Sequence, residues 1–440
     1  MKRNILILFS SIWLLLSCTT EEYFGPIPEG VPNLEELQEQ YRQELVAAPH
    51  GWYIDYRPNT ENGSTGIWVK FKDNGTVETL SDYFEFTEIQ TTPRFRVGGA
   101  VFPELIFESY SVWHKLYDQM EGNYQFRLAR MDDGRFKISD ALVGKEGKAF
   151  YLRPATEQDV TNLLARGVMN DKIIAFRNSS SAYFQNITLE NLVGSWELDH
   201  YLRKITFTWP NDEGFPETQT YPYQMTPTGI KFFSPIKVNQ QTIDSIDFGA
   251  FETDRIYVDY AGDAGPGEVT VAHTPAFPAP GAADYFMIAS RPTQLFIMNV
   301  ELTAFSPAFE PELQNMLAKR PGIVRMQLYN NDLRYSPTFR VAIYYVDPDD
   351  GNTYYANTFY SATKHGEDHV SYTFGSNNST ARNIAEAIEP LLDRIFNEDG
   401  FTVVPYTNTA TNQVLRLVSR RDSRYYITAN STLLNYLYGQ

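Results

Sequence analysis

The sequence predicts a mainly β protein made of antiparallel meanders or barrel-like domains, with an α+β part at its C-terminal end. Three observations predict this fold class. The chain contains 29 Tyr, 29 Phe and 6 Trp, and aromatic residues favour half-buried pleated strands. Short stretches of alternating apolar and polar residues are separated by turn signals such as Asn74-Gly75 and Asp133-Gly134. A length of 440 residues allows two or three domains, each with its own core.

The first eighteen residues have the layout of a secretory signal. Lys2 and Arg3 precede an apolar run, Ile5 to Leu16, which is too short to span a membrane. The run ends in Leu15-Leu16-Ser17-Cys18 and so resembles a bacterial lipoprotein signal, whose cysteine becomes the lipidated first residue. We therefore expect residues 1–17 to be a signal peptide and Cys18 to attach the protein to a membrane. The alternative is an ordinary signal peptide with an incidental cysteine.

The composition excludes some partners. Without Lys2 and Arg3, 35 basic residues face 54 acidic ones, a formal charge of −19. Such an acidic surface repels phosphate backbones, so we expect no nucleic-acid partner. Cys18 is the only cysteine, so no disulfide can form once it is acylated, and the fold rests on packing. The many aromatic rings also fit a second explanation, exposed rings that stack on sugars.

Residues 18–32 form a predicted lipidated tether. The stretch Gly25 to Pro32 is rich in proline and glycine and behaves as a semi-rigid spacer. Glu21-Glu22 resembles the tag that sends some lipoproteins to the outer face of the outer membrane, and the alternative is a pair of solvated carboxylates. We expect an outer-membrane lipoprotein that faces the cell exterior.

Residues 33–175 form the predicted N-terminal domain, a helix followed by an antiparallel meander. Asn33 and Glu36 suit a capping box, and apolar residues at helical spacing continue the helix from Leu34 to Ala47. The expected strands cover residues 52–56, 67–71, 76–80, 94–97, 104–107, 122–130, 135–139 and 148–152. A short helix over 157–168 ends the domain.

Residues 185–303 form a second β-rich domain. Its opening Gly194-Ser195-Trp196 resembles the first strand of lipocalin-like barrels, where the tryptophan plugs one end. The expected strands cover residues 192–198, 203–208, 229–233, 243–248 and 255–260. Residues 261–283 are rich in glycine, proline and alanine and predict a long surface loop. Residues 295–302 are expected to close this domain.

Residues 304–440 form the predicted α+β unit. Two helices are expected, over 312–318 and 381–396, and the second has an apolar face that includes Ile384, Ile388 and Leu391. The expected strands cover residues 324–329, 338–346, 353–359, 402–406, 414–418 and 425–428.

Two clusters could in principle hold a metal, and neither fits. His365-Gly366-Glu367-Asp368-His369 lacks the His-Glu-x-x-His order of zinc peptidases, and a strand follows it. Asp347 to Asn352 resembles a calcium loop, but the required glycine and glutamate positions hold Asn352 and Thr358. We predict a solvated loop and a hairpin turn, with no metal site and no cofactor.

Motifs for nucleophilic catalysis are missing from the sequence. It has no Gly-x-Ser-x-Gly elbow and no phosphate-binding glycine-rich loop. Paired carboxylates for sugar hydrolysis depend on proximity in space, which 54 acidic residues do not reveal. The catalytic residues are therefore unknown, and the sequence favours a protein that is not an enzyme.

Tyr110, Trp113 and His114 are the candidate ligand-binding residues. They follow the strand Leu105-Ile106-Phe107 and precede the strand that starts at Gly122. Loops at strand ends often carry ligand contacts. The alternative, which we favour, is a local aromatic cluster that seals one end of the meander, with His114 hydrogen-bonded.

These stretches resemble a known family, domain of unknown function 4302. The resemblance rests on Gly51-Trp52 after a short helix, on Gly66 to Phe71, and on Leu105 to Tyr110 with His114. It continues with Gly122 to Phe126 and with two further stretches, Gly144-Lys145-Glu146-Gly147 and Thr226 to Ile230. The chain departs from the family pattern at Ser109, Ser111 and Gln125.

The resemblance implies an outer-membrane lipoprotein that acts beside a starch-utilisation-type (Sus-like) importer. The expected partners are the TonB-dependent barrel and its substrate-binding lipoprotein. The resemblance carries over no activity and no catalytic residue. We therefore expect a non-catalytic, ligand-binding or accessory component of a system that takes up glycan or peptide. The alternative is a secreted hydrolase that acts on glycan or peptide.

Overall fold

The fold is seen in a computed structural model. It describes residues 33–140, 148–179, 182–287, 294–299, 304–330, 339–347, 350–408 and 413–433. The predicted signal peptide, the tether and Cys18 lie outside these residues. The described part is mainly β, with antiparallel strands in barrel-like units and a few helices, which confirms the predicted fold class. No helix within these ranges is long and apolar enough to cross a membrane.

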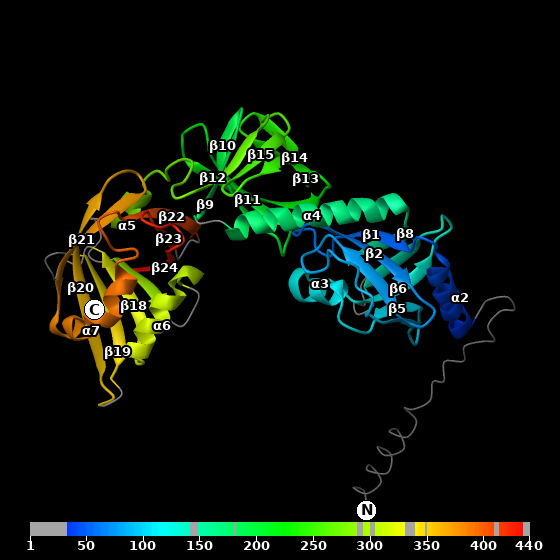
Figure 1. Cartoon of the computed structure of the whole chain (residues 1–440), viewed down its shortest axis with the longest axis horizontal. Helices are drawn as coiled ribbons and strands as arrows, with labels where there is room; N and C mark the ends of the chain where they lie inside the picture. The colour runs from blue at the N-terminus through cyan, green and yellow to red at the C-terminus, as the bar shows by residue number, and fades with distance from the viewer. Residues whose placement is uncertain are drawn as a thin grey trace, which may run out of the picture.

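Three eight-stranded units follow one another along the chain (Figure 1). In each unit the strands pair in sequence order, and the last strand pairs with the first. The second and third units are closed barrels. The first unit is a sheet with two end strands, β3 (Val77–Ser81) and β4 (Phe95–Gly98), which meet through the bridges Thr76–Arg94 and Thr79–Gln90. Closure leaves few exposed strand edges.

The first unit begins with the predicted helix α2, Leu34–Ala47, and its capping box of Asn33 and Glu36 is present. Its other elements are β1 Trp52–Tyr56, β2 Thr65–Phe71, β3 Val77–Ser81, β4 Phe95–Gly98, β5 Glu104–Phe107, α3 Val112–Met120, β6 Gln125–Arg130, β7 Phe136–Asp140, β8 Ala149–Pro154 and α4 Glu157–Ser179. Helix α4 runs past the predicted end at Val168 because Met169, Ile173 and Phe176 pack into the core of the second unit.

The second unit comprises β9 Phe184–Leu189, β10 Leu192–Asp199, β11 Lys204–Pro210, β12 Pro216–Met225, β13 Gly229–Val238, β14 Gln241–Phe251, β15 Arg255–Tyr260 and β16 Gly267–Ala272. The strand that closes it is β16, which pairs with β9 inside the segment 261–283 that we expected to be a loop. The expected closing strand, residues 295–302, does not belong to this barrel. Residues 294–299 form β17 instead, which pairs with β18 and β24 of the third unit.

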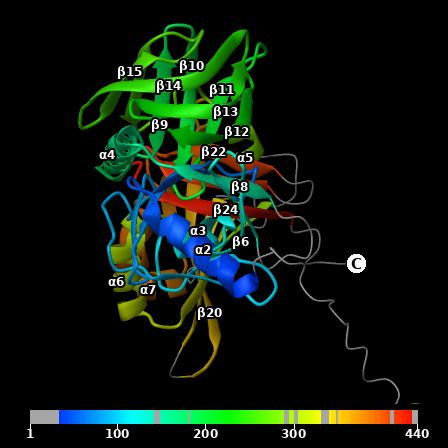
Figure 2. The same cartoon turned by 90° about the vertical axis from the view of Figure 1, so that its right-hand side faces the viewer.

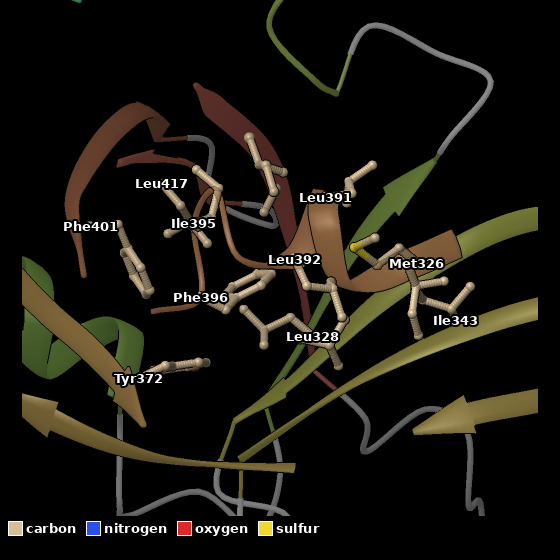
Figure 3. Packing of buried hydrophobic residues seen from close by; sticks show 14 of the residues in the cluster. Met326, Leu328, Ile343, Tyr372, Leu391, Leu392, Ile395, Phe396, Phe401 and Leu417 are labelled. Atoms are coloured by element: carbon tan, nitrogen blue, oxygen red, sulfur yellow. The ribbon is translucent and has the colours of Figure 1, made fainter. Parts of the chain in front are cut away.

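The third unit comprises α5 Ala282–Met287, β17 Gln294–Asn299, a 3₁₀ turn Pro307–Phe309, α6 Glu310–Lys319, β18 Ile323–Asn330, β19 Phe339–Val346, β20 Thr353–Lys364, β21 His369–Asn377, α7 Ser379–Leu392, β22 Phe401–Asn408, β23 Gln413–Ser419 and β24 Tyr426–Leu433. The expected α+β layer is therefore a closed barrel with added helices. Figure 3 shows Leu391 and Leu392 of α7 in the same buried cluster as Met326 and Leu328.

The units form an arch, with the second unit at its apex and the other two on the same side of it (Figures 1 and 2). The first and second units meet along α4 and through the backbone bond from Gly63 N–H to the carbonyl of Leu202, 3.0 Å. The second and third units meet at Tyr183 and Ser423, where the Tyr183 N–H donates to the serine Oγ at 2.8 Å.

Candidate functional site

The candidate site is a cleft of about 980 Å³ between the second and third units. One wall is the outer surface of β10, β11 and β12, and the other comes from β22, β23 and the start of β24. The loop from Pro275 to Ala279 closes part of the rim. Junctions between domains are frequent places for small-molecule sites, and this volume is in the range of such pockets.

The cleft wall that the second unit forms is polar because the side chains of its strands point alternately into the barrel core and out into the cleft. In β11, Ile205 and Phe207 point into the barrel core, so Thr206 and Thr208 point outward into the cleft. They lie opposite two threonines of β12. The Oγ1 atoms of Thr206 and Thr220 are 3.0 Å apart, as are those of Thr208 and Thr218. Together with Ser195 of β10 these side chains form what we call the hydroxyl wall.

An arginine beside two tyrosines lies at the junction of the walls. The Arg416 Nη1 donates to the Tyr183 hydroxyl at 2.8 Å, and its guanidinium carbon lies 5.1 Å from the centre of the Tyr426 ring. The carboxylate of Glu197 lies 3.9 Å from the same Nη1. Burial raises the pKa of Tyr183 to about 12, although Arg416 opposes this shift. Tyr183 is therefore a neutral phenol at physiological pH.

The remaining charged side chains of the cleft have protein partners. Arg177 donates to the carbonyl of Leu198 at 2.6 Å, and Arg424 pairs with Asp422 at 2.6 Å. Asp368 is buried and accepts the backbone N–H of Ala279 at 3.2 Å. Burial raises the pKa of this carboxyl above its ordinary value.

The structure brings Tyr110 and His114 together, with ring centres 6.0 Å apart, but it does not place Trp113 with them in an open site. Trp113 is fully buried on α3, where its ring stacks on Phe107 at 4.8 Å, because a helix rather than a loop carries it. Tyr110 is 60% exposed. His114 stacks on Tyr124 at 4.4 Å, and burial lowers its pKa. Tyr110 and His114 thus lie on the first unit, and neither lines the cleft.

The two clusters considered as metal sites are parts of hairpins. The rings of His365 and His369 stack at 4.5 Å, and their Nε2 atoms contact Ser371 Oγ at 2.7 Å and the carbonyl of Asp399 at 3.1 Å. The N–H of Gly351 donates to the carbonyl of Asp347 at 2.8 Å in the other hairpin. Among the residues that the structure describes, no group of three or more His, Cys, Asp or Glu could hold a metal ion.

Reasoning from the sequence missed the cleft residues. Arg416 and Tyr183 are 233 positions apart, and no local pattern links them. The two threonine pairs did leave a signal, since Thr206-x-Thr208 and Thr218-x-Thr220 both alternate with period two. Recognising it required knowledge that these stretches are neighbouring strands.

Comparison with known proteins finds one matching family model, and its description states no activity. Residues 33–250 match the family model described as "Domain of unknown function (DUF4302)". The chain therefore contains this domain, as its resemblance predicted. The matched region covers the first unit and ends within β14, before β15 and β16 complete the second barrel. No curated protein matches the sequence.

The solved structures that are similar to this chain include sliding clamps of DNA polymerase III. The clamp from Bartonella birtlesii LL-WM9 is 10% identical, with 90% of this chain and 97% of that chain covered and a TM-score of 0.15. The clamp from Pseudomonas aeruginosa bound to griselimycin is 10% identical, with 89% and 96% covered and a TM-score of 0.17. Scores this low carry no argument about the fold or the partners of this chain.

Proposed function

We propose that this chain is a membrane-anchored surface lipoprotein that binds glycan or peptide without altering it, as an accessory component of a nutrient-uptake system. The observation that carries the ligand-binding part is the cleft between the second and third units. Its walls combine hydroxyl groups, aromatic rings and an arginine, which can hold a ligand in a defined orientation. The anchoring part rests on the lipoprotein-like signal that ends at Cys18.

The proposed location and partners rest on the sequence. The acidic pair Glu21-Glu22 and the tether that follows suit display on the outer face of the outer membrane. The resemblance to the family supports a place beside a Sus-like importer, with a TonB-dependent barrel and its substrate-binding lipoprotein as partners. In that setting the cleft would collect ligand at the surface and keep it near the importer.

Ligand capture tests the proposal directly. The chain from residue 18, with Cys18→Ala to keep it soluble, is incubated with immobilised glycan and peptide libraries. We expect retention of one class and a large loss of retention in Arg416→Ala, because Arg416 contacts both Tyr183 and Tyr426 in the cleft. The matched control is Arg96→Ala, an exposed arginine of the first unit that pairs with Glu108. Retention of neither library would contradict the proposal.

Fractionation tests the anchor. The complete chain should sediment with membranes and incorporate a labelled fatty acid, and Cys18→Ala should do neither, because Cys18 is the only thiol. A Cys18→Ala protein that still fractionates with membranes would overturn this part. Digestion by protease added to whole cells tests whether the protein faces the exterior.

A hydrolase is the second candidate, favoured by two carboxylates in the same cleft. Glu197 and Asp368 both line it, and burial keeps the pKa of Asp368 raised, as a general acid requires. This candidate predicts release of products from the retained library and its loss in Asp368→Asn and Glu197→Gln. Glu252→Gln, outside the cleft, is the control. Intact ligand after prolonged incubation would argue against it.

A further inference from the structure

We infer that the ligand of the cleft is a neutral oligosaccharide, whose sugar units span from the hydroxyl wall to the Tyr183–Arg416–Tyr426 cluster. This inference rests on the proposed function and narrows its two ligand classes to one. It follows from the chemistry of the walls, from the pairing of the strands that form them, and from the charge balance of the cleft.

The hydroxyl wall suits a ligand that carries many hydroxyl groups. A threonine hydroxyl both donates and accepts hydrogen bonds, as a sugar hydroxyl does. The pairs Thr206–Thr220 and Thr208–Thr218 bond to each other at 3.0 Å, so each pair retains lone pairs for a ligand. The hydroxyl wall therefore offers a ligand uncharged hydrogen-bond donors and acceptors along β10, β11 and β12.

The opposite side offers rings and a planar donor. Tyr183 and Tyr426 have their ring centres 5.0 Å apart, and Phe277 and Pro405 also line the cleft. Such apolar surfaces can cover the C–H face of a sugar ring, while the phenol groups keep a polar end. A guanidinium has several N–H groups in a fixed plane, a geometry that can serve neighbouring hydroxyls.

The walls offer a peptide only short edges that it could join as an added strand. On the second unit, β11 is paired on both sides over residues 204–208. β10 pairs with β9 over 192–195 and with β11 over 195–199, while β12 pairs with β11 over 216–222 and with β13 over 223–225. On the third unit, β22 extends past the start of β21, and the N–H of Val403 donates to the carbonyl of Asp368 at 2.7 Å. The next residue that faces this side is Pro405, which has no N–H. On the second unit the longest open edge of the cleft is residues 216–222 of β12, and the prolines at its two ends have no N–H. The described backbone of the cleft is thus a poor template for peptide addition.

The charges of the cleft favour a neutral ligand. Arg177 and Arg424 are held by Leu198 and Asp422, and Arg416 donates to Tyr183. The chain as a whole is strongly acidic, with a formal charge of −17. The three arginines of the cleft are matched by three carboxylates, those of Glu197, Asp368 and Asp422. An anionic chain would therefore meet the acidic field of the protein without a surplus of cations in the cleft, so long-range electrostatics oppose it.

Calorimetric titration tests the inference. The soluble chain with Cys18→Ala is titrated with neutral hexasaccharides of glucose, mannose, xylose or galactose, with a uronic-acid hexasaccharide, and with random hexapeptides. The key variant is the double substitution Thr208→Val and Thr218→Val, which replaces one hydroxyl pair with a methyl pair of similar shape. The matched control is Thr188→Val with Thr242→Val, two threonines of the same barrel outside the cleft.

We expect at least one neutral hexasaccharide to bind, with affinity reduced about tenfold in the cleft variant and unchanged in the control. Binding of hexapeptides alone, or of the uronic-acid chain alone, would overturn the inference and leave the proposed ligand-binding function standing. Saccharide binding that the cleft variant does not weaken would overturn the assignment of the site. Absence of any binding would count against the proposed function itself.

Discussion

Arg203 and Asp82 form an ion pair in which both side chains are fully buried, at the junction of the first and second units. The Arg203 Nη2 lies 3.1 Å from the Asp82 Oδ1, and the exposed fraction of each side chain is 0%. The same carboxylate accepts the Thr65 hydroxyl at 2.7 Å and the Gly66 N–H at 3.2 Å. The two units that contain the domain of unknown function are thus joined by a polar contact shielded from water.

Removing Arg203 should separate the first two units or unfold them. Arg203→Ala leaves the buried Asp82 carboxylate with Arg166, 3.9 Å away, as its remaining cation, so we expect a loss of about 3–5 kcal/mol in the free energy of unfolding. Urea denaturation followed by tryptophan fluorescence measures it. Lys319→Ala, which breaks the exposed Lys319–Glu386 pair, should cost about 1 kcal/mol or less. Equal losses in both variants would contradict the role of the buried pair.

Gly63 should tolerate no side chain, because it lies against the same junction. A Cβ at this position would approach the carbonyl oxygen of Tyr223 to 2.1 Å and the Arg203 Cβ to 2.3 Å. Gly63→Ala should therefore destabilise the protein by about 1–3 kcal/mol, through overpacking. The matched control is Gly366→Ala, where a Cβ meets nothing within 4 Å. Urea denaturation of both variants measures the effect. If the midpoint of Gly63→Ala shifts no more than that of Gly366→Ala, the residues of the junction can move to accommodate the added methyl group.

Local signals predicted the parts of the fold that depend on neighbours in sequence. The helix Leu34–Ala47 has the predicted bounds because a capping box marks its start. Strand β12 was missed because its first half, from Pro216, is exposed and has no apolar alternation. The end of α4 was misplaced because contacts with another unit sustain it. The cleft depends on how two barrels meet, a relationship that no short pattern encodes.

Trp113 should matter for stability and Tyr110 should not. Trp113 is fully buried and packs against Phe107 and Phe126, so Trp113→Ala should cost about 3–5 kcal/mol. Tyr110→Ala removes a 60% exposed ring and should change the free energy of unfolding by about 0.5 kcal/mol or less. Denaturation of both variants measures this. The hexasaccharide affinity of Tyr110→Ala tests the sequence-based ligand role, and the cleft site predicts no change.

Alkaline pH should destabilise the protein through its buried tyrosines. Burial raises the pKa of Tyr223 from the ordinary 10.0 to about 12. Above pH 10 the unfolded chain loses this proton while the folded protein keeps it, so stability falls between pH 10 and about 12. Each such tyrosine contributes a slope of about 1.4 kcal/mol per pH unit.

The variant Tyr223→Phe should reduce this slope, because phenylalanine has no proton to lose. Urea denaturation at several pH values measures the slope. The control is Tyr117→Phe, at a position that is 50% exposed. If both variants keep the slope of the unaltered protein, Tyr223 does not contribute to alkaline unfolding.

Ser423 should determine how the second and third units are held around the cleft. Its side chain is fully buried, its Oγ accepts the Tyr183 N–H at 2.8 Å, and the same atom lies 2.9 Å from His273 Nδ1. Ser423→Ala leaves the Tyr183 N–H without this acceptor, a loss of about 1–3 kcal/mol at the junction. Because Tyr183 also contacts Arg416, a looser junction disturbs the cleft cluster.

Two measurements follow from this contact. In Ser423→Ala, limited proteolysis should cut the connection around residues 273–281 faster, and the affinity for a neutral hexasaccharide should fall. Ser376→Ala, at an exposed position of β21, is the matched control and should change neither. A ligand that contacts both walls of the cleft binds best when the second and third units keep their relative position. Faster proteolysis with an unchanged hexasaccharide affinity would therefore mean that the ligand contacts only one of the two walls.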